Sequence, residues 1–371
     1  MPCRRCAASP EAHHGHENGQ RLCAQGKASA IIAGMSSDPL AATVADSLRI
    51  HTFAALDPGP RLLVLGGVHG DETCGTAGIE RVLAELDGGT FGLRRGQLTL
   101  VPVANPLARR RLQREGERNL NRLFKPSAEP ADYEDRVTNV LCPLIERHDV
   151  LLDLHSFQSE GEAFAMIGPR DNTGALEPFA RAGEEGLLAL HLGTPIVVEG
   201  WLDIYAAGLA QRSAGAEVGE GALDFGRGTN EYIRNCGGYG VTLECGQHQD
   251  PQAPEVAWRA IRRALALLGM AALPQGLVAE PPRPPQLLRL ASVTDRLHED
   301  DSFVRDWATF DAVQRGEPIG MRHDGTLVSA PDDGFIVFPN ALALPGAEWF
   351  YFAHPSERVL GPAATGSAGA A

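Results

Sequence analysis

The stretch RLLVLGGVHGDE at residues 61–72 carries the features that decide the fold of this chain. A solid apolar run follows Arg61, and the stretch ends in GGVHGDE, which contains three glycines, a histidine and two acidic residues. A run that is apolar on both faces is typical of a strand in a parallel sheet covered by helices. The glycines and polar residues that follow predict a tight turn at the end of that strand.

The same pattern recurs along the chain on the C-terminal side of this stretch. Similar apolar runs are QLTLVPVA (97–104), DVLLDL (149–154), TPIVVE (194–199) and YGVTLE (239–244). Segments between the runs have helical periodicity, as at 75–86 and 254–272. Alternating strands and helices predict an α/β fold, with a mostly parallel open sheet and helices on both faces.

The two ends of the chain differ in composition from its centre. Residues 1–34 are polar and aperiodic, which predicts a disordered extension; a misassigned upstream start is the alternative interpretation. An α/β domain is expected at 35–278, followed by the proline-rich linker AEPPRPPQ at 279–286. Short alternating segments with turns then predict a small all-β domain with a disordered tail at 287–371.

Composition excludes several classes of function. The net charge of −14, from 33 Lys+Arg and 47 Asp+Glu among 371 residues, argues against surfaces that bind nucleic acid or anionic membranes. The seven cysteines are an odd, scattered set, which favours reduced thiols in the cytoplasm. No apolar run approaches the roughly 18 residues of a spanning helix, and no signal-peptide pattern opens the chain. We therefore expect a cytoplasmic protein; a homo-oligomer remains open.

Polar side chains that follow the apolar runs define a candidate site, because ligands of open α/β sheets lie at the carboxyl ends of the strands. The first run is followed by His69 and Glu72, the third leads into His155, and the last ends in Glu244. Two imidazoles and one carboxylate are a common ligand set for catalytic zinc. The H-x-x-E spacing alone is frequent by chance, so the alternative is that these two residues lie on the surface and bind no metal. Their position just after a buried strand favours metal ligands over that alternative.

A cluster of arginines is the second candidate feature. It comprises Arg109, Arg110, Arg111, Arg114, Arg118 and Arg122. Taken alone, such a charge run indicates a solvated helix face more often than a binding surface.

Five motifs together resemble the succinylglutamate desuccinylase and aspartoacylase family, a branch of the zinc carboxypeptidase-like fold. In order they are GGVHGDE, Asn105-Pro106, RNLNRLF (118–124), DLHS and TLECG (242–246). An ordered set of motifs is far more specific than any one of them. The C-terminal segments also resemble the β domain of this family.

The resemblance implies one Zn²⁺ per chain, held by His69, Glu72 and His155. Glu244 then falls where the family keeps its general base, and Arg114 matches an arginine that polarises the scissile carbonyl. Such a set would activate a water molecule for attack on an amide.

The resemblance also assigns substrate-binding residues. Asn121 and Arg122 match a pair that binds the substrate carboxylate, and Arg234 matches a further carboxylate-binding arginine. Guanidinium groups suit this role because they grip carboxylates bidentately. Asn119 departs from the family pattern, which has Asp there, and this puts in doubt whether the substrate is one of the two that name the family.

The sequence thus predicts a zinc-dependent amidohydrolase that cleaves a small acidic N-acyl amino acid, with esterase activity also open to it. One alternative is a metallocarboxypeptidase that acts on peptides. Another is an inactive binding or sensor protein on the same fold.

Overall fold

A computed structural model describes residues 47–212, 220–278 and 284–361, all within the unit Asp46–Ala371. The predicted extension at 1–34 and most of the predicted linker at 279–286 lie outside the described residues. None of the helices in the described ranges is long and apolar enough to cross a membrane.

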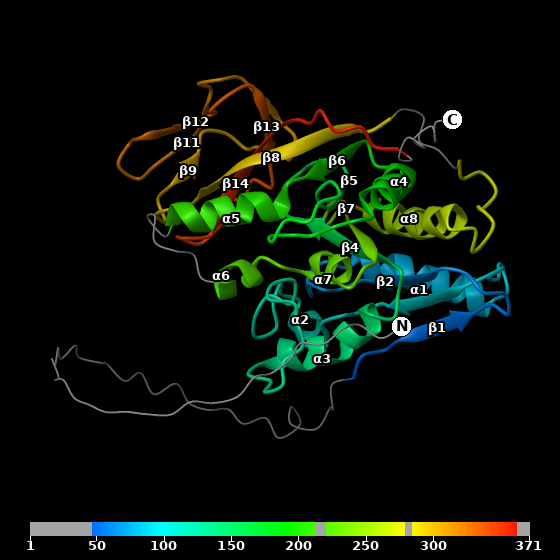
Figure 1. Cartoon of the computed structure of the whole chain (residues 1–371). Coiled ribbons are helices and arrows are strands. Elements are labelled where there is room, and N and C mark those ends of the chain that lie inside the picture. Colours follow the sequence, from blue (N-terminus) through cyan, green and yellow to red (C-terminus); the bar gives the residue numbers. More distant parts are fainter. Residues whose placement is uncertain (1–46, 213–219, 279–283, 362–371) are drawn as a thin grey trace, which may run out of the picture. The chain divides into compact units, whose positions relative to one another are not determined.

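One large mixed sheet organises the structure (Figure 1), in the order β1-β3-β2-β4-β7-β5-β6-β8-β14-β13-β10. Its strands are β1 (His51–Ala54), β2 (Arg61–Leu65), β3 (Gln97–Val101), β4 (Val150–Phe157), β5 (Phe164–Met166), β6 (Ile196–Glu199), β7 (Tyr239–Gln247), β8 (Gln286–Asp295), β10 (Ala312–Val313), β13 (Gly334–Val337) and β14 (Glu348–Pro355). A small second sheet has the order β12-β11-β9. It consists of β9 (Ser302–Phe303), β11 (Pro318–Met321) and β12 (Leu327–Ser329).

The centre of the large sheet is mostly parallel. Strand β2 lies between β3 and β4 and is parallel to both, and β7 is parallel to β4. Strand β5 is antiparallel to β7 but parallel to β6. The predicted α/β class with a mostly parallel sheet is therefore confirmed.

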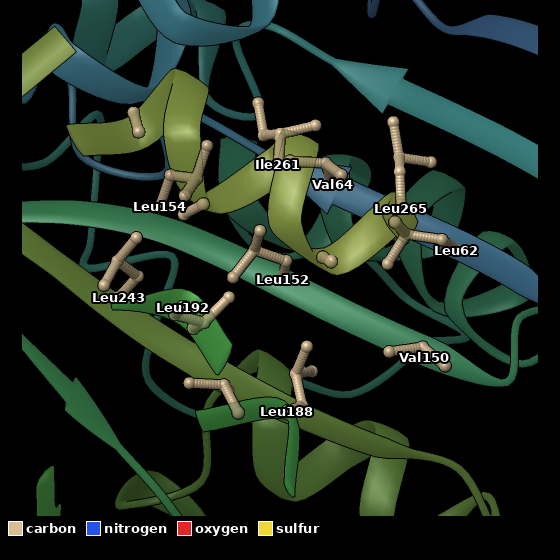
Figure 2. Close-up of a cluster of buried hydrophobic side chains, with 14 of the residues drawn as sticks. Leu62, Val64, Val150, Leu152, Leu154, Leu188, Leu192, Leu243, Ile261 and Leu265 are labelled. Atoms are coloured by element: carbon tan, nitrogen blue, oxygen red, sulfur yellow. The ribbon is translucent and has the colours of Figure 1, made fainter. Parts of the chain in front are cut away.

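Helices cover both faces of this sheet. They are α1 (Cys74–Asp87), α2 (Pro106–Arg111), α3 (Tyr133–Ile145), α4 (Ala182–Leu192), α5 (Trp201–Arg212), α6 (Glu220–Phe225), α7 (Thr229–Asn235) and α8 (Ala253–Leu267). Figure 2 shows one face, where Leu62 and Val64 of β2 pack in a cluster with Ile261 and Leu265 of α8.

The next residues of β2 point the other way, because side chains alternate along a strand. Leu63 and Leu65 pack on the opposite face with Leu141 of α3 and Ile233 of α7. Burial of each such leucine contributes about 2 kcal/mol. The solid apolar run of β2 is thus explained by a strand buried on both sides.

Strands β4 and β7 run farther than their apolar runs indicated. His155 and Glu244 lie within them as directly paired neighbours, rather than after the strand ends. Polar side chains can stay inside these strands because they face a polar pocket instead of an apolar layer.

The large sheet continues into the C-terminal β region. Strand β8 pairs in parallel with β6 of the α/β region, and β14 pairs antiparallel with β8. Figure 1 shows β8 beside β6, with β13 and β14 following. These strands therefore form one wall beside the edge where the candidate site residues lie.

Asp301 holds together the loops of this C-terminal region. Its carboxylate accepts hydrogen bonds from the backbone amides of Leu297, His298 and His323, at 2.8, 3.2 and 2.9 Å. It also accepts one from the Arg322 guanidinium at 2.7 Å. Burial opposes the charge, but Arg322 and the amides together hold the pKa of Asp301 well below its usual value.

We expect Asp301→Asn to lower the free energy of unfolding by about 2 kcal/mol at neutral pH, because the amide nitrogen faces donors. A depressed pKa stabilises the fold above the unfolded pKa near 4, and this stabilisation is lost as the pH falls below it. The difference from wild type should therefore shrink between pH 7 and pH 3 in urea unfolding, with the exposed Asp300→Asn as control. Equal stability of Asp301→Asn and wild type at pH 7 would show that the carboxylate is dispensable.

Candidate active site

The loop between β2 and α1 places two of the candidate ligands. Gly67 adopts a positive φ of 58°, and Gly70 lies so close to α2 that an added Cβ would overlap the backbone carbonyl of Ala108. Asn105 caps α2, because its side-chain oxygen accepts a hydrogen bond from the backbone amide of Ala108. The backbone amide of Asn105 donates a hydrogen bond to the Gly67 carbonyl at 2.9 Å. The loop between β2 and α1 is therefore held in place by backbone contacts at Gly67 and at Gly70.

His69, Glu72 and His155 converge at one point. All three are buried, and each offers a ligand atom within 4.8 Å of the others. Glu72 lies between the imidazoles: Oε1 is 2.7 Å from His69 Nδ1, and Oε2 is 2.9 Å from His155 Nδ1. One carboxylate and two imidazoles, all aimed at one buried point, fit a divalent metal ion such as Zn²⁺.

The second ring nitrogen of each histidine, Nε2, also has a partner. His69 Nε2 lies 3.0 Å from Asn119 Oδ1, and His155 Nε2 lies 3.0 Å from Asp153 Oδ2. Thr229 donates a hydrogen bond to the same Asp153 oxygen. Partners of this kind fix the ring orientation of metal-binding histidines. Asn119, the position that departs from the family pattern, therefore contacts a candidate ligand.

Glu244 lies beside this cluster and faces the same cavity. Its side chain is buried, and its Oε2 atom has no hydrogen-bond partner among the described residues. Burial raises the pKa of Glu244 to about 8. A carboxyl group poised near neutral pH can both accept and return a proton.

Arg114, Asn121 and Arg122 line this same cavity. The Arg114 guanidinium donates to Glu72 Oε1 at 3.1 Å and is half exposed. Arg122 is half-buried, and its guanidinium carbon lies 4.8 Å from the centre of the Trp201 ring. The structure thus brings these three residues together with the histidines and Glu244.

The cavity has a volume of about 320 Å³, which suits a small molecule. Its lining comprises His69, Asp71, Arg114, Asn121, Arg122, His155, Ser156, Phe157, Gln158, Ser159, Met166, Ile167, Trp201, Gly228, Thr229, Asn230, Glu231, Arg234, Thr242, Glu244, His248, Phe338, Pro339, Asn340, Glu348 and Tyr351.

Comparison with known proteins identifies the family. The model of the succinylglutamate desuccinylase/aspartoacylase catalytic domain matches residues 58–267. The chain belongs to the succinylglutamate desuccinylase/aspartoacylase family. A succinylglutamate desuccinylase of Pseudomonas aeruginosa strain UCBPP-PA14 is 29% identical over 171 residues, covering 41% of this chain and 48% of the relative. The chain therefore spans about half the length of the curated relatives it matches.

Solved structures of this family share the fold. The succinylglutamate desuccinylase/aspartoacylase from Rhodobacter sphaeroides gives a TM-score of 0.60 at 16% identity, covering 81% of this chain and 87% of that one. The product-bound ectoine utilization protein EutE (DoeB) from Ruegeria pomeroyi gives 0.59 at 18% identity, covering 82% and 88%. At these identities the likeness extends to the fold alone.

Arg234 differs from the other predicted substrate-binding residues in its surroundings. It is buried, and its guanidinium donates to Glu185, Glu177 and Glu231 at 2.8, 2.7 and 3.2 Å. Although burial disfavours its charge, these carboxylates raise the pKa of Arg234 above its ordinary value. Arg234 therefore reaches the cavity wall with its donors already engaged.

Sequence reasoning missed His248 and Ser156. Ser156 Oγ lies 2.9 Å from His248 Nδ1, and both residues line the cavity. Ser156 directly follows His155 in DLHS, and His248 follows Glu244 by four residues. Their positions just after the apolar runs were the available signal, but the pattern alone does not show that they meet.

We expect His69→Ala and His155→Ala each to reduce bound zinc from about one ion per chain to well below half, because two ligands make an inadequate site. Metal analysis of the purified variants measures this directly. His51→Ala, on the edge strand β1, is the control and should keep its zinc. Full zinc content in both site variants would contradict the ligand assignment.

Proposed function

We propose that this chain is a zinc-dependent deacylase, which cleaves the amide bond of a small acidic N-acyl amino acid. The observation that carries the proposal is the convergence of His69, Glu72 and His155 beside the buried carboxyl of Glu244, whose Oε2 atom has no hydrogen-bond partner among the described residues. Membership of the family supports deacylase chemistry.

The proposed cofactor is one Zn²⁺ held by His69, Glu72 and His155. Their donor atoms are buried, lie close together and are of the kinds zinc prefers. When bound, the ion would supply Lewis acidity that activates water and polarises a carbonyl. Burial and the nearby Arg114 lower the pKa of His69 to about 4, which favours the neutral imidazole that a metal ligand needs. Burial also opposes the charge of His155, but Asp153 and Glu72 outweigh it and raise the pKa of His155, so metal binding there would displace a proton.

Glu244 is the proposed proton carrier. It would take a proton from the attacking water, and then deliver that proton to the nitrogen of the departing amine. Its raised pKa of about 8 and its position beside His155 support both steps. The products are a carboxylic acid and a free amino acid.

Two arginines serve the substrate in this proposal. Arg114 points its fixed charge at the cluster, where an oxyanion would form during attack on the carbonyl. Arg122 would bind a substrate carboxylate, with Asn121 placed beside it by a hydrogen bond from the Thr229 amide. Because Arg234 is engaged by three glutamates, these two supply the main positive charge at the cavity.

The volume of the cavity, about 320 Å³, supports a small substrate over a peptide. Residues Phe338, Pro339 and Asn340, with Glu348 and Tyr351 of β14, form part of its wall. A wall of this kind would limit the room for a long peptide, which supports the deacylase over the peptidase. The buried thiols Cys74, Cys142 and Cys245 support a reducing, cytoplasmic location.

Turnover of a compound panel by the zinc-loaded protein tests the proposed function. The panel consists of N-succinyl, N-acetyl and N-formyl amino acids, with peptides of similar composition for comparison. Hydrolysis of acyl amino acids and not of peptides supports the deacylase. Faster hydrolysis of the peptides would favour a metallocarboxypeptidase, and no hydrolysis of either would favour a binding protein.

We expect Glu244→Gln to keep its zinc while turnover falls by about a hundredfold or more, since the change removes the proton carrier and not a ligand. Metal analysis and steady-state kinetics on the same sample separate the two effects. Glu162→Gln, an exposed residue, should behave as wild type. Wild-type turnover of Glu244→Gln would assign the base to another group.

A further inference from the structure

Residues 114–122, the arginine segment, include Arg114, Asn119, Asn121 and Arg122 but belong to no helix or strand. Such a segment lacks the regular backbone hydrogen bonds that hold a helix or a sheet, so its amides need other acceptors. Its exact position matters for the proposed reaction, because a displacement of about 1 Å in a catalytic arrangement can lower the rate about a hundredfold. The contacts that hold this segment are therefore part of the working site.

Glu134 of α3 holds the middle of the arginine segment. It is fully buried, and its carboxylate accepts hydrogen bonds from three successive backbone amides. These are the amides of Gly116 at 3.1 Å, Glu117 at 3.2 Å and Arg118 at 3.1 Å. Gly116 lies so close to Glu134 that an added Cβ would overlap the carboxylate. Hydrogen bonds to a carboxylate are roughly twice as strong as those between neutral groups, so this contact fixes the backbone here.

The same carboxylate also reaches the loop that contains the candidate ligand His69. Asn105 Nδ2 donates a hydrogen bond to Glu134 Oε1 at 2.9 Å, and the Asn105 backbone amide donates to the Gly67 carbonyl. Asn119 makes a second link, since its Oδ1 atom lies 3.0 Å from His69 Nε2. Glu134 therefore connects the arginine segment with the loop between β2 and α1.

Arg118 extends this connection toward the C-terminal end of the arginine segment. Its Nε and Nη2 atoms donate to Asp132 and Asp135, at 2.7 and 2.8 Å. Its Nη1 atom donates to the backbone carbonyl of Arg122 at 2.7 Å and to that of Asn119 at 3.3 Å. The planar guanidinium can meet several acceptors at once. Arg118 thus anchors the backbone of Arg122 to the beginning of α3.

We propose that Glu134 and Arg118 are positioning residues of the deacylase, which place Arg114, Asn119 and Arg122 without contacting the substrate or the metal. Neither positioning residue lines the cavity, so an effect on the reaction has to pass through the arginine segment. In Glu134→Gln, the new side-chain NH₂ group would face amide donors, and the segment would shift. The inference rests on the proposed function and extends it to residues outside the cavity.

Glu134→Gln tests the proposal, with Asp301→Asn as a matched control. Both residues are buried carboxylates that accept three backbone amides, but Asp301 lies in the C-terminal loops and does not line the cavity. Both variants should unfold at a lower urea concentration than wild type. At saturating zinc and without urea, kcat/KM for the preferred acyl amino acid should fall about tenfold or more in Glu134→Gln and less than about twofold in Asp301→Asn. Wild-type kinetics in Glu134→Gln, or equal losses in both variants, would overturn the inference.

Arg118→Lys is a second test, which does not depend on the folding of Glu134→Gln. A lysine cannot reproduce a fork that reaches two carboxylates and two carbonyls. Because Arg118 anchors Arg122, KM should rise about fivefold or more while kcat stays within about twofold of wild type. Arg322→Lys is the control, since the Arg322 guanidinium donates to Asp301 and to a backbone carbonyl away from the cavity. An unchanged KM in Arg118→Lys, or an equal rise in both variants, would contradict the positioning role.

Hydrogen exchange at single amides tests the positioning role even if no acyl amino acid is hydrolysed, a result that would refute the proposed function alone. In Glu134→Gln and in Arg118→Lys, the amides of Asn121 and Arg122 should exchange about tenfold faster than in wild type, although neither amide bonds to Glu134. The Asp301→Asn control should leave their exchange unchanged. Faster exchange confined to residues 116–118, or no change at all, would show that Glu134 and Arg118 do not hold the rest of the segment and would overturn the inference.

Discussion

The Glu72 carboxylate is the contact on which the arrangement of the site depends. It is buried, and a buried carboxylate is stable only where partners replace the water it has lost. One oxygen meets His69 and Arg114, and the other meets His155 and the Ser156 amide. These partners come from the β2–α1 loop, the arginine segment and β4, so satisfying this single group brings three distant parts of the chain together. The same convergence forms the cavity that Glu244 faces.

The α/β class and the central strands could be predicted from the sequence, because the pattern of a buried strand lies within a few consecutive residues. A strand buried on both faces must be apolar at every position, as in Leu62 to Leu65, and few other structures require this. Two of the candidate ligands could be predicted for a related reason, since His69 and Glu72 are polar residues that come just after such an apolar run. The ends of β4 and β7 were misplaced, since His155 and Glu244 read as the end of an apolar run although both strands continue through them.

The rest of the site depends on contacts between residues far apart in the chain, which leave no local pattern. Arg234 matches a carboxylate-binding arginine of the family, but Glu177 and Glu185, about fifty residues before it, engage its guanidinium. Likewise, Glu348 reaches the cavity only because of a bulge in β14. Family resemblance indicates which residue types occupy such positions. Whether a charged side chain there is available to a substrate depends on the opposite charges that the rest of the chain places around it. In this cavity Arg234 is engaged by glutamates, whereas Arg114 and Arg122 line the cavity beside the histidines.

We propose that His69, Glu72 and His155 form a zinc site at the floor of this cavity. Anomalous X-ray diffraction from crystals of the purified protein, measured on both sides of the zinc absorption edge, tests it most directly. We expect one strong peak per chain, about 2.0–2.2 Å from a donor atom of each of the three residues. An active crystal sample with no peak at this position, or with the peak at other residues, would contradict it.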